Sequence, residues 1–367
     1  MVRGRAPISA GTRAAFAPTM HLDHHARGLL RGLATGDALG LPREGLSPRR
    51  ARRRFGTVLR HRFVLGRGVI SDDTEHAFMT GQALLASRLD PARFARALAW
   101  RLRGWSAGLP AGVGWATLRA CARLWVGISP HRSGVWSAGN GPLMRAPVIG
   151  FAIVDPARRR RLIEISTRIT HTDPLALEAA HAIAEASAAA RAGVTSVGEL
   201  LGAARMPLVD DRWAAPLARL VAALADDASP ATWAAAEGLG GGVTGYVLHT
   251  LPAVLYVWLR DPRDWAGTVR RALDLGGDTD TVAAIAGALA GTVGGADRVT
   301  PALVAGICDA PLTIARLDRL AVALAATVRD EATGPIAMPW RLLQPIRNLI
   351  VLAIVLGHGV RRMIPPW

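Results

Sequence analysis

The 367-residue sequence contains no lysine, so arginine supplies all 44 of its basic side chains. Set against 28 aspartates and glutamates, these arginines give a formal net charge of +16. Such a charge favours a polyanionic partner, either a nucleic acid or an anionic membrane surface. The sequence is also rich in alanine, and a lysine-free, alanine-rich composition indicates a coding bias. Part of the positive charge therefore carries no functional meaning.

Cysteine is almost absent, since only Cys121 and Cys308 occur. Two cysteines exclude a disulfide scaffold, and their separation excludes a Cys-x-x-Cys metal or redox pair. We expect reduced or buried thiols in a cytoplasmic protein. No apolar run follows Arg3 and Arg5, so no secretory signal peptide is predicted.

Long uncharged apolar runs are also scarce. The C-terminal run, residues 348–360, has 13 residues and as a helix would measure about 20 Å, short of the ~30 Å hydrocarbon core of a bilayer. A conventional transmembrane span is therefore not expected. Two interpretations of residues 340–367 stay open. They form a helix packed on the body or in an oligomer contact, or a peripheral membrane anchor with arginine and tryptophan at the headgroups.

Apolar residues recur at helical spacing along most of the chain, whereas alternating strand patterns are short. The clearest helical stripes are Phe78-Gly81-Leu85, Phe94-Leu98-Leu102-Trp105, Val282-Ile285-Leu289-Val293 and Ile314-Leu317-Leu320-Leu324. The length allows two domains or one large one. We predict an all-α protein with one domain over residues 25–335, a flexible tail over residues 1–24 and a separate C-terminal apolar segment over residues 336–367.

Ser71-Asp72-Asp73-Thr74-Glu75 is the first acidic cluster. Two adjacent carboxylates repel each other unless a cation offsets the charge, and oxygen ligands favour a hard cation such as Mg²⁺, Mn²⁺ or Ca²⁺. The simpler interpretation is a helix N-cap at Ser71 or Asp72, with Glu75 completing a capping box.

A second cluster, Gly276-Gly277-Asp278-Thr279-Asp280-Thr281, precedes the stripe that begins at Val282. A helix cap would explain it alone, but two such clusters are more than capping requires. A fold that joined them would supply four carboxylates and two hydroxyls. That set suits two hard cations about 3.5–4 Å apart.

Three further segments are weaker signals taken singly. They are Gly36-Asp37-Ala38-Leu39-Gly40 with Glu44, Gly139-Asn140-Gly141 with Met144-Arg145, and Thr170-His171-Thr172-Asp173. A surface acid, an ordinary turn and a structural histidine would account for them. Glycine-flanked amides ahead of a helix also suit a phosphate group.

These five segments, in this order, resemble the ADP-ribosylglycohydrolase family. The resemblance spans about Gly28 to Gly295, and Asp278-Thr279-Asp280-Thr281 after two glycines is its most specific part. It implies a single-domain helical bundle with a binuclear Mg²⁺ (or Mn²⁺) site in a central cleft. It also implies a glycosidase-type hydrolase that removes ADP-ribose from a modified protein side chain or a small ADP-ribose conjugate.

The resemblance carries roles over to particular residues. The implied metal ligands are Ser71, Asp72, Asp73, Asp278, Asp280 and Thr281. The implied catalytic residues are Asp73, our first choice for taking a proton from water, with Asp72, Glu44 and Asp278. The implied substrate contacts are Asn140, Gly141, Leu143, Met144, His171 and Tyr246. Ser71 stands where the family most often has threonine. Serine keeps the hydroxyl but lacks the methyl group that stiffens the threonine rotamer.

Two other functions stay open at this point. One is a non-catalytic protein of the same fold that binds ADP-ribose or a partner. The other is nucleic-acid binding through Arg49–Arg54 and Arg158–Arg161, for which solvated arginine faces are the simpler explanation, so no nucleic-acid partner is expected. The sequence does not distinguish arginine-, serine- and O-acetyl-linked substrates, because all three share the ADP-ribose half.

Overall fold

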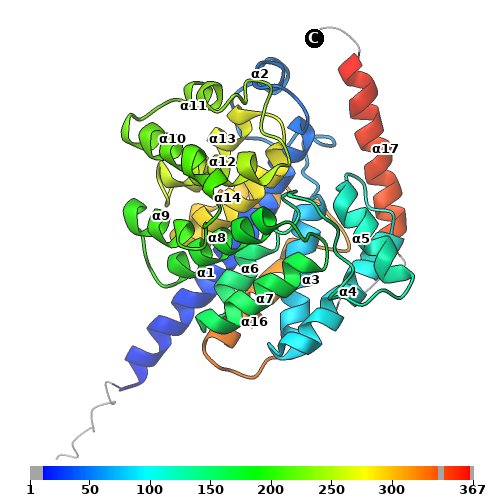
Figure 1. Ribbon diagram of the computed structural model, residues 1–367, viewed down its shortest axis with the longest axis vertical. Coiled ribbons are helices and arrows are strands. Elements are labelled where there is room, and N and C mark those ends of the chain that lie inside the picture. The colour runs from blue at the N-terminus through cyan, green and yellow to red at the C-terminus, as the bar shows by residue number, and fades with distance from the viewer. Residues whose placement is uncertain (1–10, 338–342, 364–367) are drawn as a thin grey trace, which may run out of the picture.

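The computed structural model describes residues 11–337 and 343–363, and every extended regular element in those two ranges is a helix (Figure 1). The α-helices are α1 (Gly11–Gly40), α2 (Pro48–Phe55), α3 (Asp72–Ser87), α4 (Pro91–Ala107), α5 (Trp115–Trp125), α6 (Ala146–Ala152), α7 (Pro156–Arg168), α8 (Pro174–Arg191), α9 (Val197–Arg205), α10 (Ala214–Ala225), α11 (Pro230–Ala236), α12 (Val247–Leu259), α13 (Trp265–Leu275), α14 (Thr279–Gly294), α15 (Pro301–Ala305), α16 (Ile314–Val328) and α17 (Leu343–Met363). Three short 3₁₀ turns are η1 (Leu41–Arg43), η2 (Asp211–Trp213) and η3 (Ala296–Arg298). The all-α prediction is confirmed.

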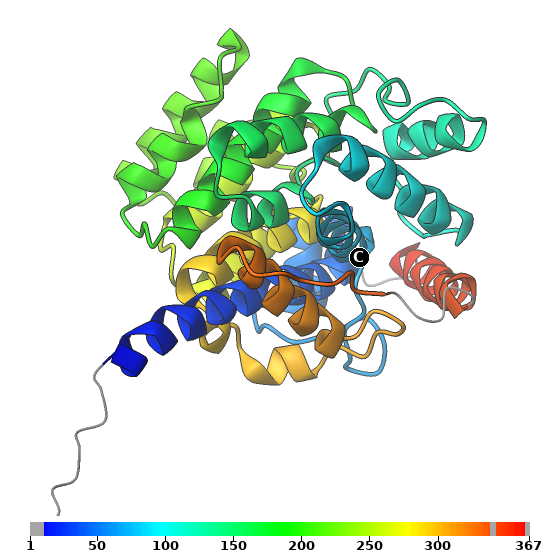
Figure 2. The same cartoon turned by 90° about the horizontal axis from the view of Figure 1, so that it is seen from below.

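The four predicted stripes lie on α3, α4, α14 and α16, and each stripe faces the interior. One continuous core includes buried side chains from Ala26 in α1 to Ala325 in α16, so the body is a single domain. Its largest fully buried side chains include four tryptophans: Trp213, Trp233, Trp258 and Trp265. Helix α14 is buried along nearly its whole length and packs against α1, α8, α12 and α13 (Figure 2).

A row of glycines sets the distance between α1 and α14. Glycines occur every fourth residue along one face of α1, at Gly28, Gly32, Gly36 and Gly40. A Cβ atom on any of them would overlap backbone atoms of α14. Residues four apart lie on one helix face, so the row lets the two backbones touch. This contact places Asp37 of α1 beside the first turn of α14.

Replacing Gly32 by alanine is expected to lower the free energy of unfolding by about 1–3 kcal/mol, because the added Cβ overlaps the Gly287 carbonyl and forces the helices apart. Chemical denaturation measures the change. Gly104 is the matched control. It lies in α4, and a Cβ there meets nothing within 4 Å. Gly104→Ala is expected to stabilise by about 0.5–1 kcal/mol through helix propensity. A neutral Gly32→Ala would contradict the close contact.

The N-terminal boundary differs from the prediction. Helix α1 begins at Gly11, so residues 11–24 of the tail predicted over residues 1–24 are helical, and residues 1–10 lie outside the described residues. The segment lacks an apolar stripe, but it contains three alanines, the residue that most favours helix. A helix already anchored by its buried part extends without a second nucleation cost.

The C-terminal helix is longer than its uncharged run. Helix α17 has 21 residues and includes Arg347, so at 1.5 Å per residue it measures about 31 Å. The estimate of about 20 Å was wrong because the helix continues past the flanking arginines. By length and composition alone, Leu343–Arg361 is apolar enough to cross a membrane, and 11% of it is buried. The two tryptophans of this segment, Trp340 and Trp367, lie outside the described residues.

Candidate active site

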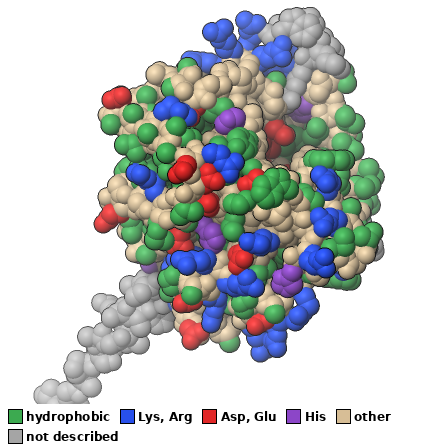
Figure 3. Space-filling model, in the orientation of Figure 1, with side chains coloured by type: hydrophobic (Ala, Val, Ile, Leu, Met, Phe, Trp, Pro, Cys, Tyr) green, Lys and Arg blue, Asp and Glu red, His purple; other side chains and the backbone are tan. Residues whose placement is uncertain are grey.

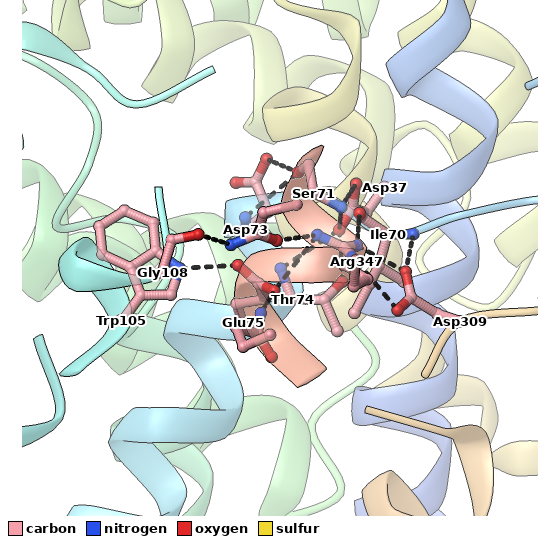
Figure 4. Close-up of polar contacts among 12 residues, drawn as sticks. Asp37, Ile70, Ser71, Asp73, Thr74, Glu75, Trp105, Gly108, Asp309 and Arg347 are labelled. Atoms are coloured by element: carbon pink, nitrogen blue, oxygen red, sulfur yellow. Dashed lines mark hydrogen bonds and ion pairs between the residues drawn. The ribbon is translucent and has the colours of Figure 1, made fainter. Parts of the chain in front are cut away.

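The start of α3 is held by a carboxylate from α1. Asp37 accepts hydrogen bonds from the backbone N–H of Ser71 (2.9 Å to Oδ2), the backbone N–H of Thr74 (3.2 Å) and the Thr74 hydroxyl. Ser71 is the N-cap, as expected, and its hydroxyl accepts from Asp73 N–H at 3.2 Å. The predicted capping box is wrong, because the Ser71 N–H donates to Asp37 and not to Glu75. The Glu75 side chain points instead to Trp105 and α17 (Figure 4).

The start of α14 is held by backbone hydrogen bonds to two loops. Gly277 donates to Leu46 and accepts from Gly45, both at 2.8 Å, and Asp278 N–H donates to the Val243 carbonyl at 2.8 Å. Gly277 has φ of +74°, and a Cβ there would overlap the Val243 backbone. Only glycine suits this position. The pairing brings the Glu44 loop next to Asp278.

The fold joins the two acidic clusters as predicted. Thr281 Oγ1 of α14 donates to Asp73 Oδ2 of α3 at 3.1 Å, and Ser71 Oγ donates to the same oxygen at 3.2 Å. Asn140 Nδ2 donates to Asp278 Oδ2 at 2.6 Å. The six predicted metal ligands therefore lie close together. We call them the acidic centre: Ser71, Asp72, Asp73, Asp278, Asp280 and Thr281.

Buried charge dominates this acidic centre. Burial, and then repulsion from neighbouring carboxylates, raises the pKa of Asp72, Asp73 and Asp280 well above the usual aspartate range. Burial also raises the pKa of Asp278, and it raises that of Asp37 to about 6. Carboxylates packed this closely destabilise one another unless protons or cations intervene.

The donor set fits hard divalent cations. Asp73 Oδ1 and Asp280 Oδ1 are buried and accept no hydrogen bond, although buried carboxylate oxygens are normally paired. Aspartate, serine and threonine oxygens are the ligands preferred by Mg²⁺ and Mn²⁺. Within residues 11–337 and 343–363, no three His, Cys, Asp or Glu side chains already surround one point. Side-chain rotation would accompany metal binding.

Without metal, the acidic centre is expected to make stability fall as pH rises. The folded-state pKa of Asp280 lies above its unfolded value, so the folded state loses stability as pH rises from about 4 through the folded pKa. Asp280→Asn removes this charge. In EDTA, we expect the variant to exceed the parent in unfolding free energy by at least about 1 kcal/mol at neutral pH and to match it near pH 4. Denaturation across this pH range tests the difference, and a variant less stable at neutral pH would contradict it.

A cavity of about 470 Å³ opens over the acidic centre. Most of the predicted residues line it: Glu44, Asp72, Asn140, Gly141, Met144, His171, Asp278, Asp280 and Thr281. A smaller cavity of about 40 Å³ lies between the acidic centre and α17, and it shares Glu44, Asp72 and Asp280 with the first. The volume of the main cavity suits a drug-sized or dinucleotide-sized ligand.

Four predicted residues are placed differently from the expectation. The Leu143 side chain has 0% exposure and lies in the core, so it does not face the cavity. The Tyr246 side chain does not line the cavity and stacks edge-on against His249. Asp73 is 1% exposed and lies behind Thr281, and Ser71 lines only the smaller cavity. Motif membership does not reveal which way a side chain points.

The cavity also has lining residues that the sequence did not single out. Trp115 and Thr117 come from the start of α5, and Ser137 comes from the loop before Asn140. Trp115 is 71% exposed, which is unusual for the largest apolar side chain. The only sequence signal was the glycine pair Gly112 and Gly114 just before it.

His171 is held against the glycine loop by a buried arginine. Arg145 donates to Thr170 Oγ1 at 2.7 Å, and that hydroxyl lies 2.9 Å from His171 Nδ1. Side chains at Gly139 or Gly141 would press on the imidazole. Burial, followed by the Arg145 charge, lowers the pKa of His171 to about 3, so the ring is neutral at physiological pH.

Helix α17 is tied to the acidic turn of α3 by a buried ion-pair network (Figure 4). Arg347 pairs with Asp309 at 2.5 Å and with Glu75 at 3.4 Å, and it donates to the Ile70 carbonyl at 2.6 Å. Gln344 donates to Glu75 at 2.6 Å. Glu75 therefore holds α17 against the start of α3 and does not line the main cavity.

Removing Arg347 leaves Glu75 and Asp309 buried with one partner fewer. We expect Arg347→Met to lower the free energy of unfolding by about 3–5 kcal/mol, since breaking a buried pair strands a charge. Arg319→Met on the exposed face of α16 is the control, with an expected change within about 0.5 kcal/mol. Equal effects of the two variants would show that the network is unimportant.

The sequence comparisons agree with this geometry. The sequence model of the family described as ADP-ribosylglycohydrolase matches residues 18–333. The chain belongs to the ADP-ribosylglycohydrolase family. An uncharacterized protein of Archaeoglobus fulgidus is 31% identical over 278 residues, covering 73% of this chain and 87% of that protein. The ADP-ribosyl-[dinitrogen reductase] glycohydrolase of Rhodospirillum rubrum is 28% identical, covering 77% and 89%.

Two further similarities support the assignment. The human ADP-ribosylhydrolase ARH3 is 27% identical, covering 62% of this chain and 72% of that protein. A solved structure titled ADP-ribosylglycohydrolase-related protein complex superposes with a TM-score of 0.64 at 27% identity, covering 84% of this chain and 99% of that chain. The chain is a glycosidase-type hydrolase of the ADP-ribosylglycohydrolase family. The family match ends at residue 333, before α17 begins.

Proposed function

We propose that this protein is a divalent-metal-dependent hydrolase that cleaves the N- or O-glycosidic bond between ADP-ribose and a protein side chain or a small conjugate. Family membership supports the reaction class. The observation that carries the metal dependence is the pair of buried, unpartnered oxygens, Asp73 Oδ1 and Asp280 Oδ1, beside a large cavity. The scarcity of cysteine supports a cytoplasmic location.

The six residues of the acidic centre would hold two Mg²⁺ or Mn²⁺ ions. When bound, such ions orient the ribose hydroxyls and lower the pKa of a bound water. Asp72 lines the cavity whereas Asp73 lies behind it, so Asp72 is better placed than our first choice to take the water's proton. Asn140 holds Asp278 by its 2.6 Å hydrogen bond and keeps that carboxylate facing the site.

The opposite wall of the cavity suits the nucleotide half of the substrate. His171 Nδ1 lies 2.9 Å from the Thr170 hydroxyl, which accepts from Arg145. With the proton on Nε2, the neutral ring would present a donor near Gly139 and Gly141. A neutral imidazole donor beside glycine amides suits a pyrophosphate or an adenosyl hydroxyl. The Trp115 indole at the same cavity offers a stacking surface.

Cleavage adds water across the glycosidic bond. The bond from the anomeric carbon to the leaving nitrogen or oxygen breaks, the water oxygen bonds to that carbon, and the water's proton ends on the leaving group. The transition state has oxocarbenium character, which nearby carboxylates stabilise. Glu44 lines the cavity within the field of Asp72 and Asp280, so it can orient the ribose or the attacking water.

A substrate panel tests this proposal. Purified protein with Mg²⁺ is incubated with ADP-ribosylated arginine, ADP-ribosylated serine and O-acetyl-ADP-ribose, and free ADP-ribose is quantified. Release from at least one substrate, lost in EDTA, supports the proposal and identifies the linkage. No release from any of the three, with metal bound, would overturn the enzymatic function and favour the non-catalytic binding protein.

A further inference from the structure

The outward face of α17 is apolar along its whole length. Its exposed large side chains are Leu343, Ile346, Leu349, Ile350, Leu352, Val355, Leu356 and Val360, each at least 36% exposed. Between Arg347 and Arg361 the only polar side chains are Asn348 and His358. We call the eight exposed apolar residues the α17 outer face. A contiguous exposed apolar surface of this kind marks an interaction site.

Polar contacts on the inner face fix which side of α17 faces outward. Asn348 Nδ2 donates to the Gly108 carbonyl at 2.7 Å, and His358 Nε2 lies 2.8 Å from the Phe63 carbonyl. Arg347 makes the buried pairs described above, and Val351 packs into a small core cluster. The helix is thus inverted relative to an ordinary surface helix, whose polar face meets solvent.

Segments close to α17 also expose apolar side chains. Leu109 is 62% exposed and follows Gly108, which binds Asn348. Leu65 is 98% exposed and lies two residues after Phe63, which contacts His358. Trp100 of α4 and Trp125 of α5 are 61% and 57% exposed. Helices α4 and α5 lie beside α17 in both ribbon views (Figures 1 and 2). Figure 3 shows hydrophobic side chains mixed with arginines on this side of the molecule.

The charge around the α17 outer face is positive. Besides Arg347, whose charge is paired on the inner face, residues 332–367 contain three arginines and no aspartate or glutamate. Helix α2, with five arginines, lies at the end of α17, where Arg54 donates to the Arg361 carbonyl at 3.5 Å. Basic residues beside an apolar helix face are typical of proteins that bind anionic lipid surfaces.

We propose that the α17 outer face docks on the surface of an anionic lipid bilayer, with the helix in the plane of the interface. A second copy of the chain fits less well, because two molecules of charge +16 repel each other. A spanning orientation fits less well too, because it would break the pairs of Arg347 with Glu75 and Asp309 and carry Arg347 into hydrocarbon. The helix lies beyond the family match, so docking is an addition to the catalytic fold.

Docking would also bring the site close to the bilayer. Helix α17 contributes Arg347 and Val351 from its inner face, and Val355 from the margin of its outer face, to the smaller cavity, which also includes Asp72 and Asp280. The outer face and the acidic centre therefore lie on opposite sides of one helix.

Vesicle co-sedimentation of the full chain tests this proposal. Phosphatidylcholine vesicles with and without phosphatidylglycerol are the probes. We expect binding to the phosphatidylglycerol-containing vesicles that weakens with added salt, and little binding to phosphatidylcholine alone. The double variant Ile350→Glu/Leu356→Glu is expected to reduce binding about tenfold or more, because both side chains would enter the interface. Met206→Glu, at a 65% exposed site outside this face, is the matched control and should bind as the parent does.

The outcomes are separable from folding and from catalysis. The double variant should keep the parent's unfolding midpoint and its ADP-ribose release in solution, since neither residue contacts the cavity. No binding to either vesicle would overturn the proposal. So would a concentration-dependent dimer that the double variant abolishes while vesicle binding is absent, because the outer face would then be a contact between copies. Failure of the hydrolase assay would leave the vesicle result unaffected.

Discussion

Replacing Asp280 by asparagine is expected to lower the rate of ADP-ribose release by about 10³-fold or more. The substitution keeps the size of the side chain and removes one negative charge from the acidic centre. A neutral amide at this position weakens the hold on a hard divalent cation and the stabilisation of a cationic transition state. Steady-state release of ADP-ribose at saturating Mg²⁺, compared between parent and variant, measures the effect.

The design of this comparison excludes a simple folding defect. Asp280→Asn is expected to stabilise the metal-free protein at neutral pH, so lost activity would coincide with a gain in stability. Asp274→Asn is the matched control. Asp274 lies in α13 near Arg43, and it lines neither cavity around the acidic centre. The control is expected to keep activity within about twofold. Full activity in Asp280→Asn would mean that the acidic centre does not catalyse the release of ADP-ribose.

Adding Mg²⁺ is expected to raise the thermal unfolding midpoint by about 5 °C. A ligand at a hundredfold its dissociation constant stabilises the folded state by about 2.7 kcal/mol, and each kcal/mol shifts the midpoint of a large domain by about 2 °C or more. The effect should exceed that of an ordinary surface ion, because the bound charge also relieves repulsion among the buried aspartates. Thermal melts in EDTA, Mg²⁺, Mn²⁺ and Ca²⁺ give the order of preference.

The same melts carry their own control. In Asp280→Asn the shift produced by Mg²⁺ should shrink to a small fraction of the parent's, while Asp274→Asn should show the full shift. An equal Mg²⁺ shift in all three proteins would mean that the metal acts at some other place on the molecule.

The sequence was informative where periodicity or charge spacing had a direct structural meaning. The stripes on α3, α4, α14 and α16 predicted those helices, and two aspartate pairs separated by about 200 residues predicted one shared site. The reason for their meeting was also present in the sequence, as the four-residue glycine spacing of α1. That spacing became meaningful only with the partner backbone of α14 in place.

The sequence was less informative about side-chain direction and about contacts made by the chain's end. Leu143 and Tyr246 were predicted as substrate contacts because they lie beside motif residues, yet the Leu143 side chain is buried in the core and the Tyr246 side chain does not line the cavity. Glu75 looked like a capping residue, because nothing in its neighbourhood indicated a partner 272 residues later at Arg347. Long-range ion pairs leave no periodic pattern.

The central claim is that the acidic centre performs metal-dependent release of ADP-ribose. The most direct test is a single time course of free ADP-ribose from the best substrate of the panel, with EDTA-stripped protein to which Mg²⁺ is added midway. The account predicts no release before the addition, rapid release after it in the parent, and none in Asp280→Asn. Equal release before and after the addition, or release by Asp280→Asn at the parent's rate, would contradict it.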